Sequence, residues 1–190
     1  GTTGLVACYG VLGFGYILPA TFLPVLARSV IEDPRIFGLA WPVFGAMAAV
    51  STVVAGRWMR PASRLQVWAV SHLLMGVGVL LPSVWPGGVA IALSALLVGG
   101  TFMVITMAGV QEIRARAVGD PTALVGRMTA AFATGQIAGP IASSLLLRYT
   151  AANGLNLALQ LGAGALLLTA AWLWRQTLSH PVDPEVSHAQ

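Results

Sequence analysis

Charged residues are scarce in this sequence. Only 8% of its 190 residues are Asp, Glu, Lys or Arg, whereas 57% are hydrophobic, and the mean hydropathy is +0.82. A water-soluble domain carries about a quarter charged residues, so this chain lacks the charge to cover a surface that faces water. The composition therefore predicts an integral membrane protein that contacts the lipid bilayer.

Lysine is absent, and all ten basic residues are arginines. This absence excludes Schiff-base chemistry and the lysine of a phosphate-binding loop. The single cysteine, Cys8, excludes an intramolecular disulfide and a cysteine-based metal cluster, and we expect it to be a small buried apolar residue. His72, His180 and His188 lack the spacing of metal ligands. We expect neither a metal nor a cofactor.

Motifs of enzymes are also missing. The sequence contains no H-E-x-x-H, G-x-S-x-G or P-loop motif, and in "GFGYIL" Leu18 stands where the dinucleotide motif requires a third glycine. The isoelectric point near 10.2 would indicate nucleic-acid binding in a soluble protein. Here the arginines lie between apolar stretches, where they set membrane topology instead. We expect neither an enzyme nor a nucleic-acid-binding protein.

Six apolar stretches have about the 20 residues that a transmembrane helix needs. Short connections rich in Pro, Gly and Arg separate them. The predicted spans cover residues 4–27, 38–57, 65–82, 88–110, 123–147 and 155–174. The sequence thus predicts an all-α membrane protein, with a six-helix transmembrane domain over 1–175 and a polar tail over 176–190.

The arginines divide unevenly between the two sides of the membrane. Six spans place both termini on one side, and positively charged loops stay in the cytoplasm. The side with the termini carries seven arginines: Arg57, Arg60, Arg64, Arg114, Arg116, Arg127 and Arg175. The other side carries three: Arg28, Arg35 and Arg148. We therefore predict that both termini, and with them the polar tail, are cytoplasmic.

The dipeptide Asp120-Pro121 precedes the fifth span. Aspartate is a favoured N-cap, and proline is favoured at the first helical position. We therefore predict that a helix begins here, and we interpret Asp120 as a structural residue rather than a catalytic one.

Polar residues recur along one face of several spans. Such faces should point inwards, because polar groups are costly against lipid. The candidates for a solute route are Tyr9, Tyr16, Thr101 and Gln136. Hydrogen bonding between helices is the alternative interpretation, favoured for a single Ser or Thr and evenly balanced for Gln136. Glu112 is a candidate for ion coupling; the alternatives are solvation or a pair with the arginine four residues on.

Other residues are expected to act through packing. Ser71, His72, Asn156 and Gln160 lie early in their spans, near an interface, and we interpret them as interface or packing residues. Glycine permits close helix contact, and proline removes a backbone donor. The residues expected to govern helix packing and bending are Gly13, Gly15 and Pro19 in the first span, and Gly135, Gly139 and Pro140 in the fifth.

Two stretches resemble a known family. "GFGYILPATFLPVLAR" (13–28) resembles the seventh transmembrane helix of the YbfB/YjiJ-type group of the major facilitator superfamily, and "GRMTAAFATGQIAGPIASSLL" (126–146) resembles its eleventh. The resemblance covers the whole chain as the C-terminal six-helix half. It implies half of a twelve-helix fold, built as two inverted three-helix repeats, with spans one, two, four and five lining a central cavity.

The resemblance also implies a function. It implies a secondary active transporter of the bacterial inner (plasma) membrane, which moves a small organic solute or drug by alternating access and is coupled to an ion. Because the chain begins at Gly1, we expect a fragment whose partner is a missing N-terminal six-helix half. The superfamily's basic loop motif is reduced to "GRWMRPASR" (56–64), without its aspartate. The alternative is a non-transporting membrane interaction or sensor protein with the same fold, and a membrane enzyme comes third.

Overall fold

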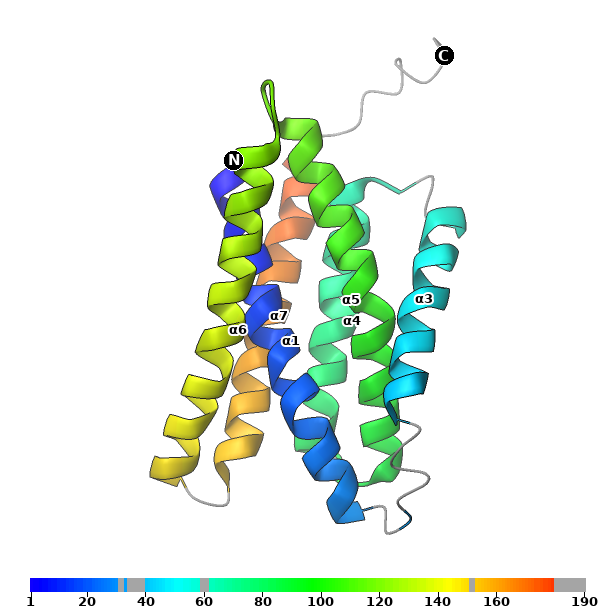
Figure 1. Cartoon of the computed structure of the whole chain (residues 1–190), viewed down its shortest axis with the longest axis vertical. Coiled ribbons are helices and arrows are strands. Elements are labelled where there is room, and N and C mark those ends of the chain that lie inside the picture. Colours follow the sequence, from blue (N-terminus) through cyan, green and yellow to red (C-terminus); the bar gives the residue numbers. More distant parts are fainter. Residues whose placement is uncertain (31–32, 34–39, 59–61, 151–152, 180–190) are drawn as a thin grey trace.

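Helices make up almost all of the described chain. The computed structural model describes residues 1–30, 33, 40–58, 62–150 and 153–179. The helices run along one long axis and form a bundle (Figure 1). They are α1 (Thr2–Val30), α3 (Ala40–Trp58), α4 (Arg64–Val84), α5 (Gly88–Arg116), α6 (Thr122–Thr150) and α7 (Gly154–Ser179).

Five of the six helices are long and apolar enough to cross a membrane. The exception is α3, whose apolar part is the shorter stretch Phe44–Arg57. The other five helices each contain their predicted span and extend beyond it. For example, α5 continues past residue 110 to Arg116, because main-chain hydrogen bonding persists into polar turns that hydropathy does not count.

The last described helix extends past the predicted end of the transmembrane domain. Helix α7 continues to Ser179, so the boundary predicted after residue 175 falls inside it. The rest of the predicted tail, 180–190, lies outside the described residues. The division into a membrane domain and a cytoplasmic tail stays a prediction.

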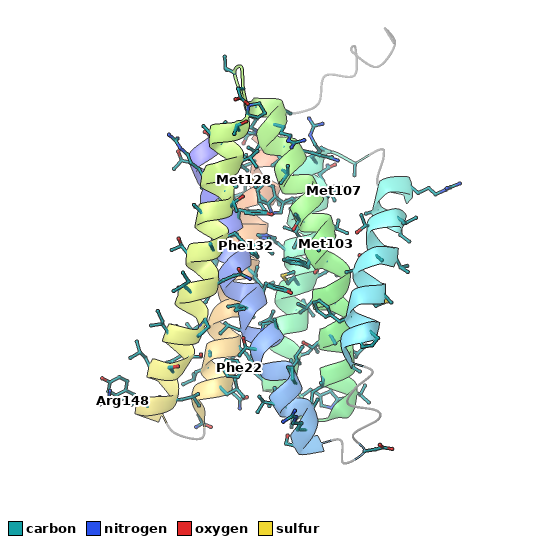
Figure 2. The ribbon with its side chains drawn as sticks, viewed as in Figure 1. Phe22, Met103, Met107, Met128, Phe132 and Arg148 are labelled. Carbon is teal, nitrogen blue, oxygen red and sulfur yellow. The ribbon has the colours of Figure 1, made fainter. Side chains whose placement is uncertain are left out.

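The first residue of α1 and the last of α7 lie at the same end of the bundle, which we call the terminal end (Figure 1). Arg148 marks the opposite end, where α6 finishes (Figure 2). Arg28, in the last turn of α1, is at the opposite end too. Six of the seven arginines predicted on the side of the termini belong to helix ends at the terminal end: Arg57, Arg64, Arg114, Arg116, Arg127 and Arg175. The seventh, Arg60, and Arg35 of the other side lie outside the described residues.

The most extensive helix contacts are those of α4 with α7, α4 with α5, and α1 with α6. Helices α4 and α7 run antiparallel behind α1, and α4 also packs against α5 (Figure 1). Helix α1 crosses the front of the bundle and contacts α6, α7 and α5, while α3 lies at an edge against α5. The buried core lies between α1, α4, α5 and α7, and its fully buried side chains include Leu12, Trp68, Met75, Ile105 and Leu166.

Local caps fix the starts of two helices. The Ser63 hydroxyl accepts a hydrogen bond from the Gln66 amide at 3.2 Å, and the Gln66 side chain accepts one from the Ser63 amide at 2.9 Å, which is a capping box. Asp120 Oδ1 accepts from the amide and hydroxyl of Thr122 at 3.0 and 2.6 Å. Asp120 therefore caps α6, but the helix begins at Thr122, so Pro121 is not its first residue.

Candidate functional site

Five aromatic side chains from four helices meet inside the bundle. Tyr16 of α1 stacks on Phe102 of α5, with ring centroids 4.1 Å apart and planes at 19°. Phe102 lies 6.1 Å from Phe132 of α6, and Phe132 lies 5.6 Å from Tyr9 of α1. Phe44 of α3 lies 6.4 Å from Tyr16. We call these five residues the aromatic cluster. It joins α1, α3, α5 and α6, the four helices that the family resemblance implies would line a cavity.

The two tyrosines of the aromatic cluster differ in accessibility. Tyr9 is 7% exposed, its hydroxyl is hydrogen bonded to the Thr106 side chain, and its ring meets Trp68 edge-on at 6.2 Å. Tyr16 is half-buried, as are the three phenylalanines. Tyr9 is therefore held in place by its neighbours, whereas Tyr16 leaves part of its surface open to a ligand.

Helices α5 and α6 meet through large side chains in the half of the bundle nearer the terminal end. Figure 2 shows Met128 and Phe132 of α6 at the level of Met107 and Met103 of α5. Met128 is 1% exposed, and a β-carbon at Gly109 of α5 would lie 3.3 Å from its methyl group. The Tyr9 ring would lie at the same distance from this β-carbon, so Met128 and Tyr9 both pack against Gly109.

Gln136 lies beside the aromatic cluster. It follows Phe132 by four residues, so the two side chains share a face of α6, and it is half-buried. The spacing places this amide one helical turn from Phe132. Its role as a solute contact stays a prediction, as do the roles of Tyr9 and Tyr16.

Thr101 is placed differently. It is 6% exposed, and its hydroxyl donates to the Leu97 carbonyl of its own helix at 2.7 Å. It shares a face of α5 with Ser94 and Val98, which pack against Gly78 of α4. The structure thus places Thr101 in helix packing, which was the alternative interpretation of a single threonine, and a solute contact there stays a prediction.

Glycines bring α1 and α6 into main-chain contact. A β-carbon at Gly135 would overlap the carbonyl oxygen of Gly10, and one at Gly13 would overlap that of Phe132. A β-carbon at Gly139 of α6 would overlap the Ile17 side chain of α1. Only residues without side chains fit here, so these glycines set the distance between the two helices.

The other residues predicted to govern packing and bending lie elsewhere. A β-carbon at Gly15 would lie 2.5 Å from Leu166, so this glycine faces α7 rather than α6. Pro19 is buried within α1, and Pro140 is exposed within α6. Their effect on helix motion stays a prediction.

Glu112 joins two helices at the terminal end. Its carboxylate is bound by Arg64 Nε of α4 at 3.1 Å and by Arg116 Nε of α5 at 2.7 Å. It lines a cavity of about 560 Å³, whose wall also includes Gln111 and Thr177. The pair with Arg116 is one of the predicted alternatives, whereas the pair with Arg64 was not predicted, because 48 residues separate the partners.

His72 was predicted near an interface, and the structure places it in the core. It is fully buried, and its Nε2 accepts a hydrogen bond from Trp68 Nε1 at 3.0 Å. The proton is therefore assigned to Nδ1, which donates to the Thr169 hydroxyl of α7 at 3.0 Å. Thr169 in turn donates to the Leu166 carbonyl at 2.9 Å. The spacing of four residues between Trp68 and His72 fits the bond within α4, whereas the bond to Thr169 spans 97 residues.

Long apolar helices around a buried core define a multi-pass membrane protein of the helical-bundle type. Within the described part of the chain, no three His, Cys, Asp or Glu side chains gather so that they could hold a metal ion. Residues 1–173 match the family described as uncharacterised MFS-type transporter YbfB, so the chain belongs to this family of the major facilitator superfamily, whose members are typically transporters and not enzymes. No curated protein matches the chain.

Proposed function

We propose that this chain is the C-terminal six-helix half of a secondary active transporter that moves a small organic solute by alternating access. In this proposal α1, α3 and α4 form one three-helix repeat, and α5, α6 and α7 form the inverted second one. The observation that carries it is the aromatic cluster. Its rings come from the first two helices of each repeat, while the third members, α4 and α7, pair with each other behind them.

The side chains of the aromatic cluster suit a particular class of solute. Half-buried rings offer apolar and π surface, and Gln136 at their edge offers one donor and one acceptor. Pockets for small molecules combine an apolar lining with a few polar groups that fix orientation. We therefore propose a solute with an apolar or aromatic body and one hydrogen-bonding group, held chiefly by Tyr16, Phe102 and Gln136.

Glu112 is the candidate for ion coupling. Its charge holds Arg64 of α4 and Arg116 of α5 together at the terminal end. Protonation would remove that charge and loosen α4 from α5. A proton taken up there would thus change the contact between the two repeats, which is the link that coupling requires.

The arginines support an orientation in the plasma membrane. Six of the eight described arginines lie at the terminal end, which we therefore place in the cytoplasm. Apolar side chains on the edge helices are open, among them Ile137 of α6 at 65% exposure and Val53 of α3 at 68%. We propose that the N-terminal six-helix half covers these faces in the transporter.

Transport by the intact protein tests this proposal. Tyr16→Ala should lower uptake or efflux about tenfold, because stacking on an aromatic ring contributes up to about 1.5 kcal/mol. Tyr16→Phe should retain most of the transport. Tyr149→Ala, at an exposed position of the opposite end, is the matched control.

Three outcomes separate the alternatives. Wild-type transport by both Tyr16→Ala and Gln136→Ala would remove these residues from the route. Solutes of the proposed class should raise the melting temperature of the wild-type protein and not that of Tyr16→Ala. If no solute in a broad screen changes the melting temperature or is transported, the interaction or sensor function becomes the better conclusion.

A further inference from the structure

An open groove runs along the outer surface between α4 and α7, the two helices that contribute nothing to the aromatic cluster. Its volume is about 500 Å³. Small side chains form its floor, where Ala69 is 2% and Ala170 is 6% exposed. Large apolar side chains form its walls, where Leu73 is 47% and Trp174 is 46% exposed. The groove exists because alanines lie between larger neighbours.

The groove has the direction of a lipid chain. Its residues on α7 run from Leu167 to Trp174, so at 1.5 Å per residue it is about 10 Å long and parallel to the helix axes. Both helices are long and apolar enough to cross a membrane. A groove on their outer surface therefore opens sideways into the bilayer. In the bilayer, the apolar partner that can lie along such a groove is a lipid acyl chain.

The end of the groove is positively charged. Trp174 is followed by Arg175, which also lines the groove and is exposed. Tryptophan is enriched at the depth of the lipid headgroups, and arginine near a helix end extends to the same depth. Arg175 forms no ion pair with an acidic residue in the described parts of the chain. A guanidinium binds a phosphate group through two parallel hydrogen bonds.

We propose that this groove binds one anionic phospholipid. The acyl chain lies on Ala69, Ala170 and Ala171, and the phosphate is bound by Arg175. A zwitterionic phospholipid offers the same chain, but its own positive group weakens the attraction to arginine. The site is separate from the proposed solute route, because it is built on the outer surface of α4 and α7, so it does not depend on what the protein transports.

Native mass spectrometry of the intact protein tests this site. The purified protein is titrated with phosphatidylglycerol or with phosphatidylcholine of the same acyl chains, and bound lipids are counted. We expect one phosphatidylglycerol to be retained in preference to phosphatidylcholine. Arg175→Gln should lower the affinity for phosphatidylglycerol about fivefold, which is the usual contribution of one basic residue near an anionic headgroup, and should leave phosphatidylcholine unaffected. Arg175→Lys should keep most of the preference.

Control variants separate the groove from general attraction to charge. Arg114→Gln removes an exposed arginine at the same end but outside the groove, and it should retain the lipid. Ala171→Phe fills the groove and should weaken binding of both lipids, whereas Ala92→Phe, at an exposed alanine of α5, should not.

Three results would overturn the proposal. The first is equal retention of the two lipids by the wild-type protein. The second is an equal loss in Arg114→Gln and Arg175→Gln, which would indicate only the surface potential of the terminal end. The third is displacement of the bound lipid by glycerol phosphate, which would indicate a site for soluble anions that has no need of the acyl chain.

Discussion

Two helix pairs in this bundle are joined in opposite ways. Between α4 and α7 a polar bridge of side chains makes part of the contact, in which the buried His72 joins Trp68 on its own helix to Thr169 on the other. Between α1 and α6 the contact is made by main chain, where Gly135 meets the carbonyl of Gly10. The first pair has a hydrogen bond that fixes its register, whereas the second combines glycine contacts to main chain with the apolar pair Tyr9 and Phe132.

This difference predicts different mechanical roles. A hydrogen bond between buried groups is lost when helices slide, so α4 and α7 should move as one unit. Among the described residues, glycine and apolar contacts join α1 to α6 without a hydrogen bond between side chains. We therefore expect that α1 and α6 can rotate against each other while they remain in contact. In the proposed transporter, α4 and α7 are the scaffold, and the pair formed by α1 and α6 changes its angle during transport.

The largest expected effect is that of a methyl group in the glycine contact. Gly135→Ala places a β-carbon on the Gly10 carbonyl oxygen, which is main chain and cannot turn aside. Overpacking of this kind costs about 1–3 kcal/mol of folding free energy. The substitution should push α1 and α6 apart, and we expect it to abolish transport. Melting temperature and transport by the intact protein provide the measurement.

Gly126→Ala is the matched control on the same helix. Nothing lies within 4 Å of its β-carbon position, so this substitution should be neutral or should stabilise the helix by up to about 1 kcal/mol. Equal effects at Gly126 and Gly135 would show that the main-chain contact between α1 and α6 does not matter.

The next effect tests the scaffold pair. Thr169→Val keeps the side-chain shape but removes the hydroxyl to which His72 donates, so a buried N–H loses its partner. Hydrogen bonds between membrane helices contribute about 0.6 kcal/mol on average and up to about 1.7, and we expect a loss of about 1 kcal/mol with transport retained. Thr169→Ser should restore the stability. The free energy of unfolding in mixed micelles measures both.

Thr134→Val on α6 is the control for Thr169→Val. Both threonines donate to the carbonyl four residues earlier, but Thr134 is exposed. If the two variants lose the same stability, the bridge through His72 contributes nothing to the contact between α4 and α7, and the contrast between the two helix pairs fails.

Hydropathy predicted the helices well and their contacting faces less well. Five of the six predicted spans coincide with helices long enough to cross a membrane, whereas the span at 38–57 coincides with the shorter apolar stretch Phe44–Arg57. About 20 apolar residues in a row have few other structures available. Polar residues on one face of a helix, however, are compatible both with a cavity and with a packed interface, so the pattern does not distinguish the two. Thr101 was predicted on a route, and its hydroxyl satisfies the Leu97 carbonyl of its own helix.

Partners distant in sequence could not be predicted. His72 lies 97 residues from Thr169, and Glu112 lies 48 residues from Arg64. A single sequence contains no signal for which helices become neighbours. Local pairs such as Glu112 with Arg116, and the cap formed by Asp120, were predictable because their spacing lies within one helical turn.

A smaller effect is expected where α4 meets α5 through charge. Glu112→Gln removes both ion pairs, but the side chains of Arg64 and Arg116 are 51% and 23% exposed, so water screens them. We expect a loss of less than about 1 kcal/mol. The loss should shrink at high salt, whereas the loss in Thr169→Val should not. A salt-independent loss in Glu112→Gln would show that these pairs act as buried ones.

The smallest effect is expected at Asp120, outside both helix pairs. Hydrogen bonds from the Thr122 hydroxyl and amide hold its pKa below the ordinary 3.8. Because the folded pKa is the lower one, the contribution of Asp120 to stability is complete above the unfolded pKa and is lost as the pH falls through the folded value. Asp120→Asn keeps the cap but not the charge, so its difference from wild type should be small at pH 7 and should vanish below the folded pKa.

The Asp120 carboxyl is well suited to direct measurement, because it is fully exposed in the connection between α5 and α6. Its carbon resonance, followed by NMR from pH 6 downwards, should titrate below the value in an unstructured peptide. A midpoint at or above 3.8 would mean that the two bonds from Thr122 do not persist in solution. Because this cap acts only on the first turn of α6, acid should fray that turn while the bridge between α4 and α7 stays intact, and amide exchange at Thr122 and at Thr169 distinguishes the two regions.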